Sequence, residues 1–213
     1  MVKLTAGLEL IAEKARAVLS STDAAREKAL RLSRDAQRYS TDAIRSVHRG
    51  DYEEARERLS LARELLKELD RELDGHPELQ HAGFVYSAQK EHVEGYVTLG
   101  LIVDNTLPDP DEFGVGYAAY LNGLGEAVGE LRRHILDIIR KGELERCENL
   151  LEAMDDIYCM LATMDFPDAM TGGLRRTTDA VRGILERTRG DMTIALRQQQ
   201  LEEKLNKLEK KLT

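Results

Sequence analysis

Apolar residues recur at steps of three and four along almost the whole chain, the spacing that places them on one face of an α-helix. Turn and capping residues divide this pattern into separate helices. We expect helices over about residues 4–20, 23–49, 51–73, 77–105, 111–140 and 143–164, then a segment that ends near 189 and a last helix from 191 onward. Because no shift in composition marks a domain boundary, the sequence predicts a single all-α domain over residues 1–213.

The divisions between these helices come from residues with defined conformational preferences. A Ser20-Ser21-Thr22-Asp23 cluster can cap the second helix, and Asp51 with Glu54 forms a capping-box-like start to the third. Gly50 and Gly142 follow the ends of two helices. Three segments that contain proline supply further breaks: Asp74-Gly75-His76-Pro77, Pro108-Asp109-Pro110 and Phe166-Pro167.

The last helix carries an apolar stripe. After the first member, the residues follow at alternating three- and four-residue steps: Ile194, Leu201, Leu205, Leu208 and Leu212. This spacing is typical of a coiled coil, in which the stripe packs against a second helix. We therefore expect a helix–helix or subunit contact there, and a homo-oligomer well above a dimer.

Composition agrees with a helical protein and limits its partners. Of 213 residues, 33% are charged and 5% are aromatic, a balance that is poor for a β fold. The formal net charge of −8 argues against nucleic-acid affinity spread over the whole surface, so such binding requires a local basic patch. Because we find neither an apolar signal core nor an apolar run of about 18 residues, we expect a soluble, cytoplasmic protein without a membrane partner.

The chain has two cysteines, Cys147 and Cys159. They lie twelve residues apart in one predicted helix, which separates them by about 18 Å of helical rise and is too far for a disulfide. We expect both to be buried thiols. No cysteine cluster of the kind that binds a metal is present.

The candidate chemistry lies in Glu91-His92-Val93-Glu94-Gly95, within a long helical run that has few other acids. Carboxylates three residues apart on a helix are separated by about 60° around its axis, so Glu91 and Glu94 point the same way. Glu91 also shares the stripe of a buried face, formed by Phe84, Ala88, Gly95, Leu99 and Ile102. Buried carboxylates need a positive partner, which is either a metal ion or a basic side chain. A register that turns the pair toward solvent is the third alternative.

Three glycines fall within seven residues of the fifth predicted helix: Gly123, Gly125 and Gly129. Each costs a helix about 1 kcal/mol relative to alanine, so their presence requires a reason. Gly123 and Gly129 flank Glu126 on its own face and would let a second helix or a ligand approach its carboxylate. Close helix packing through small residues, with Glu126 and Glu130 in solvent, explains the same pattern.

Basic residues gather on the second predicted helix despite the acidic total. Four of them are spaced to share a stripe: Arg31, Arg34, Arg38 and Arg45. Between residues 31 and 49 the acids are Asp35 and Asp42, so the helix is distinctly basic. The stripe is either a solvated face or a surface for a phosphate backbone.

Several stretches, taken in order, resemble the translin family, and translin-associated factor X more than translin itself. They are Leu32-Ser33-Arg34-Asp35, Val47-His48-Arg49, residues 90–95, residues 120–131 and Arg187-Thr188-Arg189-Gly190-Asp191. Residues 164–169 and 173–176 are similar to the archaeal-type members. The resemblance covers nearly the whole chain, and its specificity comes from the order and spacing of the stretches.

The resemblance implies a bundle of about seven helices that assembles into a hollow, octamer-like homo-oligomer. It also implies an endoribonuclease that uses Mg²⁺, or Mn²⁺ in its place, to cleave single-stranded or short RNA, with single-stranded DNA as a further ligand. The family's two glutamates fall on Glu91 and Glu94, and its third carboxylate, an aspartate, falls on Glu126. These three are the expected metal ligands and catalytic residues. Lys90 stands where the family usually has glutamine, which puts a charge beside the site.

In this interpretation the stripe of Arg31, Arg34, Arg38 and Arg45 binds the nucleic-acid backbone, Arg34 foremost. Two other classes stay open on the sequence. One is a non-catalytic oligomer that binds single-stranded nucleic acid, favoured by the basic helix and by glutamate in place of aspartate at position 126. The other is a purely structural helical oligomer, favoured by the leucine-rich tail and the acidic charge.

Overall fold

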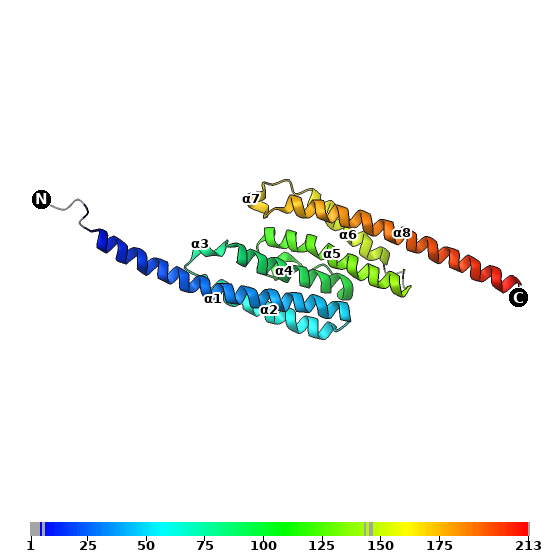
Figure 1. Ribbon diagram of the computed structural model, residues 1–213, viewed down its shortest axis with the longest axis horizontal. Helices are drawn as coiled ribbons and strands as arrows, with labels where there is room; N and C mark the ends of the chain where they lie inside the picture. Colours follow the sequence, from blue (N-terminus) through cyan, green and yellow to red (C-terminus); the bar gives the residue numbers. More distant parts are fainter. Residues whose placement is uncertain (1–4, 6, 143, 145–146, 213) are drawn as a thin grey trace.

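Long helices lie side by side along one axis in the computed structural model of the protein (Figure 1). The structure describes residues 5, 7–142, 144 and 147–212, and within these residues it contains no β-strand. The predicted all-α fold class is therefore confirmed. No helix in the same residues is long and apolar enough to cross a lipid bilayer.

The elements follow one another in the order α1 (Leu8–Arg49), α2 (Tyr52–Glu72), α3 (Pro77–Gln80), α4 (Gly83–Leu99), a π-helical turn (Gly100–Asp104), a 3₁₀ turn (Pro110–Glu112), α5 (Tyr117–Lys141), α6 (Cys147–Ala162), α7 (Asp168–Thr171) and α8 (Leu174–Leu212). Helices α4 and α5 form the centre of the bundle (Figure 1). The α1–α2 hairpin packs on α4, whereas α6 and α8 pack on α5 and on each other. The charged residues singled out on α4 and α5 thus lie in the middle layer.

Small residues let the central helices approach one another closely. A Cβ atom at Gly123 of α5 would lie 2.6 Å from the Lys90 carbonyl oxygen and 2.8 Å from Val93 Cβ, both on α4. A Cβ atom at Gly95 of α4 would lie 2.8 Å from Leu59 Cδ2 of α2. Gly123 therefore serves close helix packing, which was one of the two interpretations of its place in the sequence.

The first two predicted helices are one continuous helix, α1, so the expected break at Ser20–Asp23 is wrong. The segment contains neither glycine nor proline, and a helix propagates through capping residues when nothing interrupts its backbone hydrogen bonds. The Thr22 hydroxyl instead donates to Glu78 of the α3 turn at 3.0 Å.

The expected break at Gly190 is also wrong, because α8 continues through it. Buried side chains lie on both sides of the glycine, with Leu185 and Thr188 before it and Met192 after it. The Arg132 guanidinium of α5 donates to Thr188 Oγ1 at 3.1 Å and to Asp191 Oδ2 at 2.8 Å. Packing across the glycine thus outweighs its unfavourable helix propensity of about 1 kcal/mol.

Other predicted boundaries need smaller corrections. The expected helix over 77–105 is divided: α3 ends at Gln80, and Ala82 takes an extended conformation before α4 begins. The helix expected from 111 begins at Tyr117, after the 3₁₀ turn. The helix expected over 143–164 is described as Cys147–Ala162, and Glu143 lies outside the described residues.

Asp51 precedes α2, but its side chain does not cap that helix, so the capping-box interpretation is wrong. The two acids are held by the adjacent arginines instead. Asp51 accepts from Arg49 Nε at 2.9 Å, and Glu54 accepts from Arg49 and Arg58. In these bonds both the donor and the acceptor are charged, whereas in a cap only the carboxylate is, so the acids take guanidinium partners.

The two cysteines are both in α6, as predicted, and both are free thiols. Cys147 is buried, whereas Cys159 is exposed, so the expectation of two buried thiols is wrong for Cys159. Their separation of twelve residues turns them to different faces of the helix, and one of these faces is covered by the core.

Both ends of the bundle extend beyond its packed part (Figure 1). The start of α1 exposes the apolar side chains of Leu8, Leu10, Ile11, Val18 and Leu19, and the end of α8 exposes Ile194, Leu201, Leu205 and Leu208. The side chain of Leu212, the last member of the predicted stripe, lies outside the described part of the chain. Each end therefore presents an apolar stripe that the rest of this chain leaves uncovered.

We predict that Gly123→Ala destabilises the protein by about 1–3 kcal/mol, since the added methyl group would force α4 and α5 apart against a backbone carbonyl. Gly129→Ala is the matched control in the same helix, where a Cβ atom would meet nothing within 4 Å. It should stabilise the protein by up to about 1 kcal/mol through helix propensity alone. Urea unfolding monitored by circular dichroism measures both, and a shift of the two variants in the same direction would contradict the packing interpretation.

Candidate metal and nucleic-acid site

A cavity of about 690 Å³ opens between α4, α5, the α7 turn and the first turns of α8. Its charged lining includes Lys90 and Glu94 from α4, Glu126 from α5, and Asp168 and Arg176 from α7 and α8. Lys90 and Glu94 are one helical turn apart, so they point to the same side of α4. The cavity therefore collects both signs of charge from segments that are distant in sequence.

Among the carboxylates of the site, Glu94 has the pKa that is shifted most from its ordinary value. Burial, and then the nearby carboxylates of Glu91, Glu126 and Glu130, raise the pKa of Glu94 from 4.5 to about 8, while Lys90 acts weakly in the opposite direction. No ion pair or hydrogen bond of its side chain is found among the described residues. Such a crowded group is stabilised by a proton or by an added cation.

Glu126 is paired within the chain. Its Oε1 atom lies 2.5 Å from the Lys90 ammonium nitrogen, which reaches from α4 to α5. The side chain of Lys90 is 24% exposed and that of Glu126 is 38% exposed, so the pair stands at the wall of the cavity rather than in the core. The basic partner thus falls on Glu126. Glu91 and Glu94, the pair for which the sequence predicted a positive partner, form no ion pair among the described residues.

Glu91 turns toward α1 rather than into the cavity. Its Oε1 atom accepts a hydrogen bond of 2.7 Å from the Thr41 hydroxyl. The structure therefore brings Glu94 and Glu126 to one cavity, with Glu91 close enough to raise the pKa of Glu94 but bound to a neighbouring helix. The sequence predicted that Glu91 and Glu94 point the same way, but of the two only Glu94 lines the cavity, because the contact with α1 decides where the Glu91 carboxylate points.

The carboxylates suit a hard divalent cation by chemistry, although they are not arranged as a closed cage. In the described part of the chain, no group of three or more His, Cys, Asp or Glu side chains could hold a metal ion as it stands. Mg²⁺ keeps several waters and is commonly bound by one or two carboxylates. Glu94 and Glu126 on one cavity, with Glu94 lacking a cationic partner, satisfy that smaller requirement.

His92, between the two glutamates in sequence, takes no part in this cavity. Its ring is fully buried and packs edge-on against Tyr96 and Phe113, with ring centroids 4.9 Å and 6.0 Å away. Burial, and to a lesser extent Arg63, lowers the pKa of His92 to about 3, so the imidazole is neutral. His92 therefore belongs to the opposite, core-facing side of α4.

The sequence did not single out His48 or assign a role to Glu130. His48 Nε2 of α1 lies 2.5 Å from Glu130 Oε2 of α5. This hydrogen bond first, and then the charges of His48 and Arg133, lower the pKa of Glu130, while burial acts in the opposite direction. An ionised carboxylate only accepts, so the imidazole donates through Nε2. The available signal was the four-residue step from Glu126 to Glu130, which puts both acids on one face of α5.

The arginine stripe of α1 lies beside these acids. Thr41, which binds Glu91, and His48, which binds Glu130, are seven residues apart and so mark one side of α1. Arg34 and Arg45 lie seven residues before and four residues after Thr41, on that same side. All four arginines of the stripe, Arg31, Arg34, Arg38 and Arg45, are exposed.

The four arginines differ in how far their charges are compensated. Arg38 lies 3.0 Å from Asp35, and Arg45 lies 3.1 Å from Asp42. Arg31 and Arg34 have no ion pair among the described residues. Arg31 and Arg34 therefore keep the more available charges for an anionic ligand.

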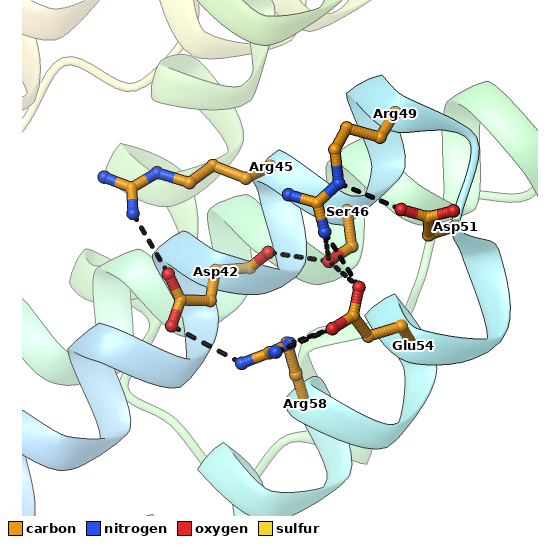
Figure 2. Close-up of polar contacts among 7 residues, drawn as sticks. All are labelled: Asp42, Arg45, Ser46, Arg49, Asp51, Glu54 and Arg58. Atoms are coloured by element: carbon orange, nitrogen blue, oxygen red, sulfur yellow. Dashed lines mark hydrogen bonds and ion pairs between the residues drawn. The ribbon is translucent and has the colours of Figure 1, made fainter.

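The far end of the stripe joins a network that holds α1 to α2 (Figure 2). Asp42 lies between Arg45 and Arg58, with a distance of 3.4 Å to Arg58. Glu54 accepts from Arg58 at 2.6 Å and from Arg49 at 2.8 Å. These bonds fix the α1–α2 hairpin, so the basic stripe is presented on a rigid support.

On the opposite wall of the cavity, the side-chain amide of a buried asparagine joins three helices, a role that the sequence did not indicate. Asn122 of α5 donates to the Thr171 carbonyl oxygen at 2.7 Å and accepts from the Thr177 hydroxyl at 2.6 Å. These bonds tie α7 and α8 to α5. Arg176, one residue before Thr177, lines the cavity and has no ion pair within the described ranges.

The fold and this site define a helical-bundle protein whose cavity is lined by three acidic and two basic side chains. No family model matches the sequence. The chain is 32% identical over 193 residues to the uncharacterized protein MJ0175 of Methanocaldococcus jannaschii, which covers 90% of this chain and 85% of that protein.

Several solved structures are similar to this one. AfC3PO, in its crystal structure and in its complex with duplex RNA, superposes with a TM-score of 0.77 and 34% identity over 86% of this chain and 95% of that chain. Apo-NeC3PO superposes with a TM-score of 0.73 and 22% identity over 91% of this chain and 99% of that chain, which shows the common fold. With these similarities, the chain belongs to the translin family, as the resemblance of its sequence predicted.

We predict that the stability of the metal-free protein falls as the pH rises from about 5 to 8 in a way that depends on Glu94. The unfolded carboxyl loses its proton near 4.5, whereas the folded one keeps it to about 8, so over this range the folded state binds more protons and loses stability with rising pH. Glu94→Gln should remove this dependence and raise stability at pH 8 by about 1–3 kcal/mol, after allowance for solvent screening.

Thermal unfolding in EDTA at several pH values measures this effect. A gain of about 1–3 kcal/mol corresponds to roughly 2–10 °C in Tm for a chain of this size. Glu152→Gln, which removes an exposed carboxylate on α6, is the control and should follow the wild-type profile. Parallel profiles for wild type and Glu94→Gln would show that Glu94 is not crowded in the folded protein.

Proposed function

We propose that this protein binds RNA and cleaves it as a Mg²⁺-dependent endoribonuclease, with Mn²⁺ as a substitute metal. The observation that carries the proposal is the meeting of Glu94 and Glu126, from two helices, at one cavity in a member of the translin family. The complex of AfC3PO with duplex RNA supports RNA as the ligand. Single-stranded or short RNA is the proposed substrate, and single-stranded DNA is a further proposed ligand.

Glu94 and Glu126 would hold the metal ion, and Glu91 would join them if its carboxylate exchanged Thr41 for the ion. A bound divalent cation supplies an activated water and neutralises charge that develops on the phosphoryl oxygens. The crowding that raises the pKa of Glu94 favours any such cation, because the cation replaces the proton that the acid otherwise keeps.

The proposed reaction is hydrolysis of a phosphodiester. The oxygen of a water molecule forms a bond to phosphorus while the bond from phosphorus to the leaving ribose oxygen breaks. A carboxylate of the cavity accepts the proton of the water, and the leaving oxygen takes up a proton from solvent.

The basic residues around the cavity have a separate role in this proposal. Arg34, with the other members of the α1 stripe, would hold the phosphate backbone beside the acids, and Arg176 would contact it from α8. Phosphate contacts of this kind place a nucleic acid without reading its sequence. Arg31 and Arg34 should contribute more than Arg38 and Arg45, whose charges are partly compensated by aspartates.

A second candidate function is a non-catalytic RNA-binding oligomer. It is favoured by the pairing of Glu126 with Lys90 and by the lack, within the described residues, of a ready three-ligand group. This protein would use the arginine stripe and leave the acids without metal. Cleavage assays separate the two functions.

We also propose a homo-oligomer, octamer-like as in the implied family assembly. The apolar stripes at the two ends of the bundle are its structural support, because exposed stripes of this kind are stable when a second surface covers them. The end of α8 alone presents Ile194, Leu201, Leu205 and Leu208.

We predict that the double change Leu201→Ser and Leu205→Ser lowers the mass of the particle in solution, because it removes about half of the apolar stripe of α8 while sparing the packed bundle. Light scattering coupled to size-exclusion chromatography measures the mass. Gln199→Ser, on the opposite side of the same turn, is the control and should leave the assembly intact. A wild-type protein that is a stable monomer at micromolar concentration would refute the assembly.

We predict that Glu91→Gln, Glu94→Gln and Glu126→Gln each reduce metal-dependent RNA cleavage by at least about a hundredfold, because each loses a negative charge that the ion requires. RNA binding should persist or tighten, since a charge that repels phosphate is removed. Labelled RNA incubated with Mg²⁺ or with EDTA gives the rates, and filter binding in EDTA gives the affinities. Glu152→Gln is the control and should cleave at the wild-type rate.

Arg34→Ala should show the converse pattern, with weaker binding and a flatter salt dependence. Cleavage by Glu94→Gln at the wild-type rate, or cleavage by wild type that persists in EDTA, would refute the nuclease. RNA binding without any metal-dependent product would select the non-catalytic oligomer.

A further inference from the structure

Lys90 stands between the two acids that the proposed metal would use. It lies one turn before Glu94 on α4, and its ammonium nitrogen is 2.5 Å from Glu126 Oε1 on α5. The close packing at Gly123, directly against the Lys90 carbonyl oxygen, brings α5 within reach of this side chain. The pairing is therefore built on a close contact between the two central helices rather than on a free surface.

Three of the four acids in and around the site have a hydrogen-bond or ion-pair partner, and the fourth has none among the described residues. Glu91 is bound by the Thr41 hydroxyl, and Glu130 is bound by His48. Glu126 is bound by Lys90, while Glu94 has no hydrogen-bond or ion-pair partner in the part of the chain that the structure describes. Among the described residues that line the cavity, Lys90 is thus the cationic side chain that forms an ion pair with a carboxylate of the same lining.

An ammonium group in hydrogen-bond contact with Glu126 occupies the space from which another cation would approach the same oxygen. Two cations on one carboxylate oxygen repel each other strongly at such distances. A divalent ion can therefore bind Glu126 Oε1 only when the ammonium moves away. The long, flexible side chain of lysine permits this movement, and the 24% exposure of Lys90 leaves room toward the cavity mouth.

We propose that the Lys90 ammonium competes with the metal ion for the Glu126 carboxylate. Lys90 holds Glu126 in the metal-free protein and thereby sets how tightly the site binds a divalent cation. This inference rests on the proposed function for the metal site itself and adds the residue that tunes it. Lys90 acts through Glu126 and is therefore a positioning residue rather than a catalytic one. Once displaced, its ammonium lies free at the mouth of the same cavity for an anionic ligand.

The first test is direct metal binding, measured by isothermal titration of the protein with MnCl₂ in the absence of RNA. Lys90→Gln should bind Mn²⁺ roughly tenfold more tightly than wild type, a difference of about 1.4 kcal/mol. Lys90→Arg keeps the charge and should bind like wild type. Lys67→Gln breaks an equivalent pair of 2.7 Å with Glu64 on α2 and should also bind like wild type.

A second measurement uses the wild-type protein and so does not depend on how the variants fold. The rate at which the Lys90 amine is labelled by an acylating reagent, measured by mass spectrometry, should rise on addition of MnCl₂ because the ammonium leaves Glu126. Labelling of Lys67 should not change. An unchanged labelling rate at Lys90 under saturating Mn²⁺ would overturn the proposal, as would equal Mn²⁺ affinity in wild type and Lys90→Gln.

The outcomes separate this inference from the proposed function. Tighter Mn²⁺ binding by Lys90→Gln without any RNA cleavage supports the role of Lys90 and rejects the nuclease. Metal-dependent cleavage with equal Mn²⁺ affinities supports the nuclease and rejects the role of Lys90. If neither protein binds Mn²⁺ in a manner that Glu94→Gln abolishes, both are rejected.

Discussion

The contact of α4 with α5 through Gly123 is the constraint on which the site depends. Because no side chain stands between the helices at this point, the Lys90 carbonyl and Val93 lie directly against the α5 backbone. The residues one turn further along each helix, Glu94 and Glu126, then border one cavity. A larger residue at position 123 would separate the helices and, with them, the two carboxylates. The contact at Gly123 therefore sets both the packing of α4 on α5 and the relative positions of Glu94 and Glu126.

The second consequence of this contact is crowding of like charge. Several carboxylates act on Glu94 in a partly buried place, and its raised pKa records the free energy needed to ionise it there. The fold meets the excess charge with three different partners, which are the Thr41 hydroxyl, the His48 imidazole and the Lys90 ammonium. One carboxylate is left without such a partner. A site with one unpaired carboxylate is suited to take up a cation. Which cation it prefers depends on the oxygen ligands rather than on the fold.

Helix α1 connects this acidic centre to the basic surface. Its bonds from Thr41 and His48 hold one side of the helix against α4 and α5, and the spacing of its arginines then places Arg34 and Arg45 on that side as well. The network with α2 at Asp42 and Glu54 ties this end of the helix to its neighbour (Figure 2). Phosphate-binding charges and carboxylates are thus presented together without a flexible loop.

The sequence by itself determined the helical class, the positions of most helices and the candidate residues, because these follow from local spacing and from turn residues. It placed Glu91 and Glu94 on one side of α4 and the arginines on one stripe. Only the tertiary structure decided that α8 runs unbroken, since packing on both sides of Gly190 outweighs a local preference. It also decided that Glu91 turns to Thr41, that Lys90 reaches Glu126, and that His48 meets Glu130. Partners such as these lie many residues apart in the chain. Packing sets the distance between their helices, and the local spacing of residues does not reveal that distance.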